Sequence, residues 1–302
     1  NVDDWEPIHS AIRAGEVDVL LVSPERLNNP GFRDAVLPRL AATCGLLVVD
    51  EAHCISDWGH DFRPDYRRIR TLLGDLPEGI PVLATTATAN ARVTADVAEQ
   101  LGVSTRSTTA TGSTTATGSS AGDGVLVLRG SLDRESLRLG VVRLRTPEQR
   151  LAWLADHLAE QPGSGIVYCL TVAATQEIAD YLRSRGHAVA AYSGQTETTE
   201  RHALEQDLIA GRVKALVATS ALGMGFDASL GFVVNMGAPS SPVAYYQQVG
   251  RAGRGADLPP EGAPVGLLPA PEDRDICTYF GSLAFPREDV VRRVLQVLAD
   301  EG

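Results

Sequence analysis

Lysine is almost absent from this chain of 302 residues: Lys214 is the only one, and every other basic side chain except histidine is arginine. A phosphate-binding loop of the Gly-Lys-Ser/Thr type needs a lysine directly after a glycine. Lys214 follows Val213, so these 302 residues contain no such loop. One common means of holding a nucleoside triphosphate is therefore missing from the sequence.

Paired cysteines and long apolar runs are missing too. The four cysteines (Cys44, Cys54, Cys169 and Cys277) show no Cys-x-x-Cys spacing. This argues against a disulfide framework or a structural zinc site and favours a reducing compartment. No apolar run approaches the roughly 20 residues that cross a bilayer, and we expect no signal peptide. These features predict a cytoplasmic protein without a membrane partner.

The charge balance is acidic, with a net charge of -11. A protein that coats nucleic acid by bulk electrostatics is normally basic, so this class is disfavoured. A local binding groove remains compatible with the charge. The chain is 44% hydrophobic and 22% charged, which is ordinary for a globular protein, and it is long enough for two domains.

Short apolar, β-branched runs alternate with amphipathic stretches, which predicts an α/β fold with parallel sheets. Helical periodicity is clearest within residues 93–101, 151–158 and 178–182. The expected strands are residues 17–22, 45–49, 81–85, 125–128, 139–144, 165–169, 188–192, 215–218, 232–235 and 265–268.

Residues 104–124 differ from the rest because they contain the hexapeptide Thr-Thr-Ala-Thr-Gly-Ser twice in succession. Such a tract cannot bury a core, so we expect a mobile loop. We predict a first domain over residues 1–130 and a second over 131–280. Residues 281–302 should form a helix that packs on the second domain or begins a further module.

The most informative segment is the seventeen residues that begin at Asp50. Asp50 and Glu51 follow an expected buried strand, and two adjacent carboxylates there are costly without a cation or a reacting water. Downstream comes an aromatic and basic loop that contains Trp58, Phe62 and Arg63. A bland alternative is an acidic turn followed by a surface loop.

This segment resembles motif II and the aromatic-rich loop of RecQ-type, superfamily 2 DNA helicases with a DEAH box. Further stretches resemble the family's motifs in the family's order: Ib at residues 23–27, III at 84–89, IV at 165–169, V at 218–227 and VI at 247–254. Residues 239–246 are most similar to the actinobacterial-type branch. The adenine-reading motif, the Walker A loop and motif Ia have no counterpart, so we expect an N-terminally truncated chain.

The resemblance implies two RecA-like lobes, the first one incomplete, with ATP and Mg²⁺ bound between them. Asp50 would hold the magnesium, Glu51 would polarise the attacking water, and His53 would link both to motif III. Arg251 and Arg254 would act on the γ-phosphate, Arg254 being the better arginine-finger candidate.

The same resemblance implies coupling roles for Thr86, Thr88 and Gln247, and nucleotide contacts for Gly225 and Asp227. DNA contacts are implied for Arg26, Trp58, Phe62, Arg63 and Thr219. The implied partners are single-stranded and partially duplex DNA at the nucleoid, with 3′-to-5′ unwinding in DNA repair or recombination. We expect very weak ATP binding and negligible turnover without a Walker A loop.

Three alternatives stay open. The motif III stretch departs from the family at Thr85, where leucine is usual, and Thr88 or Asn90 could simply cap a helix. Arg251 and Arg254 could be a surface salt-bridge pair. The whole chain could be a non-catalytic fragment that binds DNA or a partner, or a translocase that does not separate strands.

Overall fold

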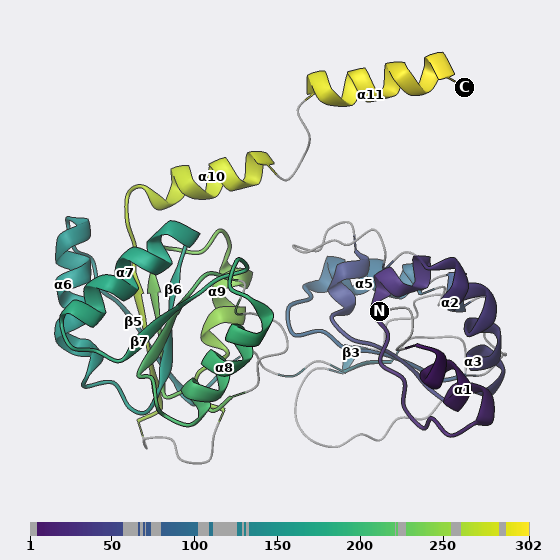
Figure 1. Ribbon diagram of the computed structural model, residues 1–302, viewed down its shortest axis with the longest axis horizontal. Helices are drawn as coiled ribbons and strands as arrows, with labels where there is room; N and C mark the ends of the chain where they lie inside the picture. The colour runs from purple at the N-terminus through teal and green to yellow at the C-terminus, as the bar shows by residue number, and fades with distance from the viewer. Residues whose placement is uncertain are drawn as a thin grey trace. The chain divides into compact units, whose positions relative to one another are not determined.

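The computed structural model describes residues 5–56, 66, 69, 71–73, 80–101, 109–110, 126–128, 130, 133–220, 222, 228–254, 261–283 and 288–301. The chain divides into two compact units, Asn1–Ser131 and Leu132–Gly302 (Figure 1). Among the helices of the described residues, none is both long and apolar enough to cross a bilayer.

The first unit has short elements. Its strands pair in parallel, β1 with β2 and β3 with β4. In chain order the elements are α1 (Glu6–Ala14), η2 (Pro24–Asn28), α2 (Pro30–Ala35), α3 (Leu37–Thr43), β1 (Leu47–Val49), η3 (Ala52–Ile55), β2 (Val82–Ala84), α5 (Ala91–Gln100), β3 (Thr109–Ala110) and β4 (Val127–Leu128).

The core of the first unit lies on one face of β1. Val49 is buried there with Phe32 and Val93, whereas Val48 points to the other face and is exposed. This is the period of two that a strand imposes on its side chains. The register pairs Val49 with Ala84, so the residues that follow β1 and β2 lie side by side.

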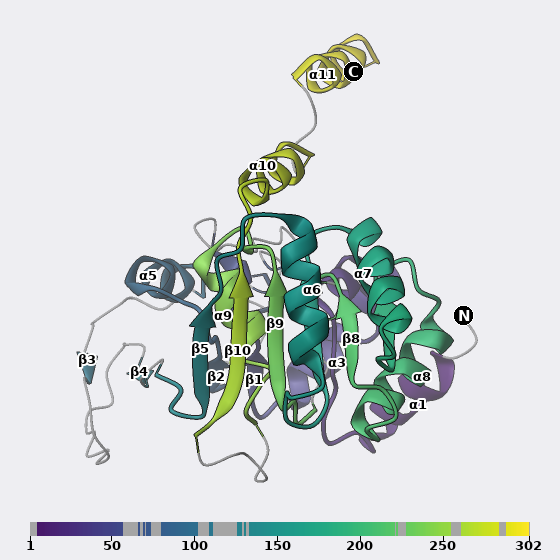
Figure 2. The same ribbon diagram turned by 90° about the vertical axis from the view of Figure 1, so that its left-hand side faces the viewer.

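The second unit is built on one six-stranded sheet with the order β5-β10-β9-β6-β8-β7, in which all neighbours are parallel (Figure 2). Its elements are β5 (Leu137–Val141), α6 (Pro147–Leu158), β6 (Gly165–Cys169), α7 (Val172–Ser184), β7 (Val189–Tyr192), α8 (Thr198–Ile209), β8 (Ala215–Ala218), β9 (Phe232–Met236), α9 (Pro242–Val249), β10 (Ala263–Leu268), α10 (Asp273–Leu283) and α11 (Glu288–Glu301).

Both faces of this sheet are covered. Val167 of β6 packs with Leu154 of α6 and Leu182 of α7 in one core. Ile166 packs with Leu208 of α8 in the other. Because both faces are buried, the central strands read as continuous apolar runs, and β6 is buried at all of its five positions.

The predicted α/β fold with parallel sheets is confirmed, but the strand expected at residues 17–22 is wrong. This stretch is irregular, and Val19 and Leu21 are 78% and 91% exposed. It pairs with no other strand among the described residues, and an apolar run becomes a strand only where a neighbour completes its hydrogen bonds. Of the repeat tract, only Thr109–Ala110 is described, as β3.

The helix expected near the end of the chain is present as α11. Its apolar side chains Val290, Val294 and Leu298 are 43%, 53% and 63% exposed. A helix packed on the second domain would bury that stripe, which is exposed among the described residues, and the role of this segment as a packed helix or the start of a module stays a prediction.

Candidate functional site

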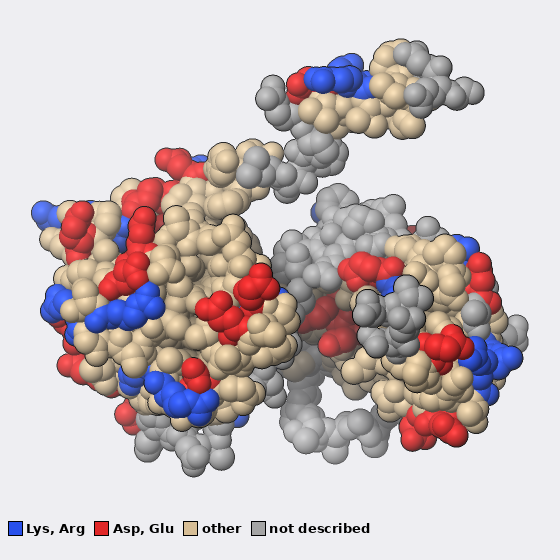
Figure 3. Space-filling model, in the orientation of Figure 1, with Lys and Arg blue, Asp and Glu red and all other residues tan. Residues whose placement is uncertain are grey.

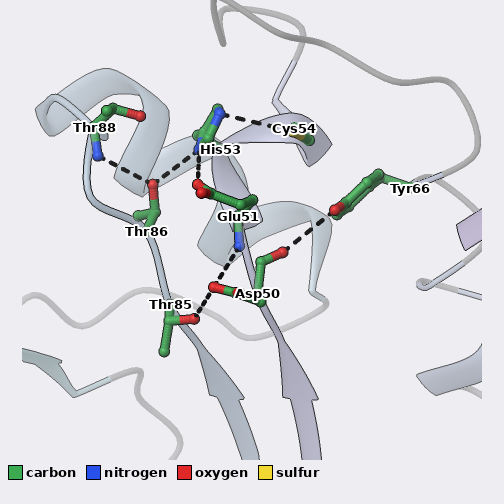
Figure 4. A network of polar contacts seen from close by, with 8 residues as sticks. All are labelled: Asp50, Glu51, His53, Cys54, Tyr66, Thr85, Thr86 and Thr88. Atoms are coloured by element: carbon green, nitrogen blue, oxygen red, sulfur yellow. Dashed lines mark hydrogen bonds and ion pairs between the residues drawn. The ribbon is translucent and has the colours of Figure 1, made fainter. Parts of the chain in front are cut away.

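Asp50 follows β1 directly, and one oxygen of its carboxylate is fixed. The Thr85 hydroxyl donates to Asp50 Oδ1 at 2.7 Å, and the Glu51 backbone N–H donates to the same oxygen at 2.9 Å (Figure 4). The Tyr66 hydroxyl donates to the Asp50 carbonyl oxygen at 3.4 Å. Because the side chain is exposed, its second carboxylate oxygen can take a ligand.

This arrangement fits a magnesium ion that arrives with a phosphate. Mg²⁺ keeps several waters and is usually bound by one or two carboxylates together with substrate phosphates. Within the described ranges, no group of three or more His, Cys, Asp or Glu side chains could hold a metal ion. The open Asp50 oxygen is a suitable ligand for a Mg²⁺ ion that arrives with a phosphate.

Glu51 has a backbone conformation that is rare for its type. It is the one described non-glycine residue with positive φ, at φ 48° and ψ 43°. Left-handed conformations are unfavourable for side chains with a Cβ and cluster at functional sites. The turn directs Glu51 Oε2 to His53 Nδ1, 3.2 Å away, an ion-pair contact without hydrogen-bond geometry.

His53 is buried and connects the carboxylate to the next motif. Its Nδ1 lies 3.1 Å from Thr86 Oγ1, and its Nε2 lies 3.7 Å from Cys54 Sγ. Burial by itself would lower the pKa of His53, but the contacts with Cys54 and with the Glu51 carboxylate outweigh it and raise the pKa to about 9. His53 is therefore positively charged at neutral pH and can donate from both ring nitrogens.

This charge predicts a pH-dependent stability. Because folding raises the pKa of His53 from its ordinary value of 6.5 to about 9, this group stabilises the fold fully below pH 6.5, and the stabilisation is lost as the pH rises through 9. We expect the free energy of unfolding of the first unit to fall by about 3 kcal/mol at most across that window. Urea titrations followed by circular dichroism measure it. His53→Gln should remove this part of the slope, and an unchanged slope would contradict the ion pair.

The motif III threonines divide their roles. Thr86 Oγ1 receives the Thr88 backbone N–H at 3.3 Å and contacts His53. Thr88 Oγ1 is buried and has no hydrogen-bond partner. The helix-capping role falls to Asn90, whose side chain accepts from the Val93 N–H at 2.9 Å. Of the two residues that the capping alternative named, Asn90 therefore caps α5, whereas Thr88 does not.

In the second unit the two motif VI arginines follow the C-terminal end of α9. Arg254 is exposed, and its Nε donates to the Gly250 carbonyl at 2.8 Å. Arg251 is half-buried. Burial raises the pKa of Tyr168 to about 12, and the positive charge of Arg251 acts in the opposite direction.

The Arg134 side chain supports the turn at residues 250–254 through hydrogen bonds to its main chain. Its guanidinium donates to the carbonyls of Ala252 at 3.2 Å, Gly253 at 3.3 Å and Gly250 at 3.5 Å. A Cβ on Gly253, whose φ is +69°, would lie 2.8 Å from the Ser136 carbonyl oxygen. The close approach thus requires glycine, and the Arg134 segment and the arginine turn are fitted to each other.

Comparison with known proteins shows which protein families the chain is similar to. A DEAD/DEAH box helicase domain matches residues 3–97, and a helicase conserved C-terminal domain matches residues 149–256. The ATP-dependent DNA helicase RecQ of Haemophilus influenzae is 33% identical over 261 residues, which cover 86% of this chain and 38% of that protein. Over most of its length, the chain is therefore similar in sequence to RecQ-type helicases. It spans about two-fifths of the length of this curated relative.

Solved structures show that this RecQ-like chain has the fold of RecA-like helicase lobes. Mycobacterium smegmatis helicase Lhr, bound to ssDNA and AMP-PNP, matches with a TM-score of 0.61 and 19% identity over 87% of this chain and 33% of that one. Saccharomyces cerevisiae Dbp5, bound to RNA and ADP BeF3, matches with a TM-score of 0.58 and 19% identity over 81% and 60%.

Some of the remaining predicted site residues lie within the described residues, and the others lie outside them. Arg26 in η2 stacks on an aromatic ring, and Thr219 follows β8 directly, half-buried. Gln247 lies in α9, and its neighbour Gln248 accepts a 2.5 Å hydrogen bond from Asn235. The other predicted residues lie outside the described ranges: Trp58, Phe62, Arg63, Gly225 and Asp227.

Two contacts that position the RecQ-like motifs were not predicted from the sequence. Thr85 fixes Asp50, and Arg134 fixes the arginine turn. The pairing of β1 with β2 would have indicated Thr85, because it follows β2 where Asp50 follows β1. Arg134 hydrogen bonds to main-chain atoms, which leave no mark on the sequence.

Proposed function

We propose that this chain is the core of an ATP-dependent DNA helicase of the RecQ type with a DEAH box, which unwinds DNA 3′ to 5′ at the nucleoid in repair or recombination. The observation that supports this most is the fixed constellation of Asp50, Glu51 and His53 with Thr85 and Thr86. It combines an open carboxylate oxygen for a cation, a carboxylate for a water and a positively charged relay to motif III.

The proposed chemistry needs each of the two carboxylates for a different role. Bound Mg²⁺ would neutralise charge on the phosphates of ATP. Asp50 presents its open oxygen to that ion, while Thr85 prevents the carboxylate from rotating. Glu51 accepts a proton from the attacking water. His53, close to Glu51 Oε2, orients this carboxylate and communicates its state to Thr86.

The second unit supplies cationic groups. Arg251 and Arg254 stabilise the charge that develops on the transferred phosphoryl group, with Gln247 as a further polar contact. Gly225 and Asp227 complete the nucleotide contacts. Arg134 keeps the turn at residues 250–254 in one conformation, so the two guanidinium groups do not have to be ordered during the reaction.

DNA binding is proposed for a separate set of residues. Trp58 and Phe62 stack on bases, and Arg63 contacts a phosphate in the aromatic-rich loop. Arg26 and Thr219 contact the backbone of the strand. Thr88, whose buried hydroxyl has no partner, is available to transmit a change at the nucleotide.

The 302 residues by themselves should turn over ATP negligibly, because they contain no Gly-Lys-Ser/Thr loop. We expect activity in a chimera that places the preceding region of the Haemophilus influenzae relative before this chain. In that chimera, Glu51→Gln should lower DNA-stimulated ATP hydrolysis by about 100-fold or more. Glu99→Gln, an exposed glutamate on α5, is the matched control.

Two results would contradict the proposal. ATP hydrolysis by the 302-residue chain that disappears with Glu51→Gln would show that the missing loop is dispensable. An active chimera that is insensitive to Glu51→Gln would remove Glu51 from the chemistry. The second candidate function, a non-catalytic DNA-binding chain, is favoured by the absent lysine loop and requires DNA binding without nucleotide binding.

A further inference from the structure

The six-stranded sheet of the second unit is open at its β5 edge. Among the described residues, β5 pairs only with β10 (Figure 2). Four of its five positions are exposed, and the apolar side chains of Leu139 and Val141 are 61% and 57% exposed. The opposite edge strand, β7, has no exposed position. An exposed apolar edge is a template for a further strand, so β5 is a docking surface.

The main-chain groups of Leu139 and Val141 point away from the sheet. The Ser136 carbonyl and the Val142 N–H both bond to β10, at 2.8 Å and 2.9 Å. Along a strand, the N–H and C=O of one residue face one neighbouring strand, and those of the next residue face the other. The even-numbered residues of β5 therefore bond to β10, and Leu139 and Val141 present their donors and acceptors outward.

The two ends of β5 carry opposite charges. Glu135 precedes the strand, whereas Arg143 and Arg145 follow it, and all three side chains are exposed. None of them forms an ion pair with another described residue. An antiparallel strand of the same sequence would bring its basic end to the acidic end of β5, and a parallel one would bring like charges together. Opposite charges across paired strands are stabilising and like charges are destabilising, so the charges fit a second copy that runs antiparallel.

We propose that the β5 strands of two copies of this chain pair edge to edge, antiparallel, about a two-fold axis at Gly140. In this register Leu139 of each copy faces Val141 of the other, so that the outward main-chain groups bond and the exposed apolar side chains cover each other. Glu135 of each copy comes toward Arg145 of the other. The two-fold axis makes the contact self-complementary and closes it at the dimer. The inference is independent of the proposed helicase chemistry.

Local opposition of charge matters because the whole chain is acidic. Each copy has a net charge of -11, so two copies repel each other at long range. On the face shown in Figure 3, acidic and basic side chains of the described residues are interspersed, without a continuous basic tract that could attract a second copy. The charges at the two ends of β5 then select the partner and its direction. Because one strand edge is a small interface, we expect a dissociation constant of about 10 µM to 1 mM.

The test is sedimentation velocity on the 302-residue chain across that concentration range, where we expect a monomer–dimer equilibrium. Val141→Pro removes an outward N–H and leaves the bonds to β10, because proline is tolerated where an edge N–H faces solvent. It should weaken dimerisation about 10- to 100-fold, and Val141→Ile, which keeps the N–H, is the matched control. Glu135→Arg should weaken it about 3- to 10-fold, and adding Arg145→Glu to the same chain should restore it.

Cross-linking through Gly140→Cys is a second readout, which reports the register directly. The added Cβ would meet only the Val265 carbonyl oxygen, at 3.9 Å, and residues that face each other across antiparallel strands are within reach of a disulfide. Mild oxidation should give a linked dimer, whereas Thr199→Cys, at an exposed position of α8, should match wild type. A wild-type chain that stays monomeric throughout the range overturns the proposal. A dimer that Val141→Pro and Glu135→Arg leave unchanged, without a cross-link at position 140, overturns it too.

Discussion

Replacing Arg134 by alanine is expected to lower the free energy of unfolding of the second unit by about 2 kcal/mol. The variant removes the donors of three main-chain carbonyls, those of Gly250, Ala252 and Gly253. The Ala252 and Gly253 carbonyls then lose the donor that Arg134 supplies, while the Gly250 carbonyl keeps Arg254 Nε at 2.8 Å. The turn that carries Arg251 and Arg254 loses its support. In the proposed enzyme this disorder would reduce phosphoryl transfer without touching the nucleotide.

Urea unfolding measures the stability, and limited trypsin digestion reports on the turn, because cleavage after Arg251 or Arg254 requires it to open. Arg134→Lys should fall between wild type and alanine, since an ammonium cannot reproduce the planar fork of donors. Arg138→Ala, at an exposed position in β5, is the control and should stay within about 0.5 kcal/mol of wild type. Equal trypsin sensitivity in Arg134→Ala and wild type would refute the supporting role.

Gly231→Ala is expected to be more damaging, at about 3 kcal/mol or more. A Cβ at this position would overlap the Pro162 carbonyl group, and Gly163 N lies only 3.3 Å away. All of these neighbours are backbone atoms, so no side chain can move aside. The Gly231 N–H also donates to the Ser164 carbonyl at 2.9 Å, which ties the start of β9 to the strand beside it.

Thermal and urea unfolding of Gly231→Ala would show this loss. Gly281→Ala is the control in the same unit, since nothing lies within 4 Å of its added Cβ and the residue is inside α10. Alanine there should be neutral or stabilise by up to about 1 kcal/mol. A Gly231→Ala variant as stable as Gly281→Ala would mean that the loop before β9 is not packed as described.

The sequence predicted best those parts of the fold that are buried on both faces. The strand at residues 165–169 was predicted with the bounds that the structure gives it. Every position is apolar or small, and the elements before and after it in the chain are helices. The stretch at residues 17–22 has a similar composition but no partner strand among the described residues. An apolar, β-branched composition allows a segment to form a strand, but pairing with a neighbouring strand determines whether it does.

The site was predictable where chemistry leaves a pattern and unpredictable where it does not. Asp50 and Glu51 were selected because two adjacent carboxylates after an expected buried strand are costly without a cation or a reacting water, and His53 was selected because the resemblance to motif II implies it. Thr85 was treated only as a departure from the family, although it donates to Asp50 from 35 residues away. Such contacts depend on strand register, which a single sequence does not specify.

The most direct test of the whole account is a pair of fluorescence titrations on one preparation of the 302-residue chain, with labelled single-stranded DNA and with a labelled ATP analogue in Mg²⁺. We predict saturable binding of the DNA and no measurable binding of the nucleotide, because the residues proposed to contact DNA are present and the Gly-Lys-Ser/Thr loop is not. A folded chain that binds the nucleotide tightly, or that binds no DNA, would contradict it.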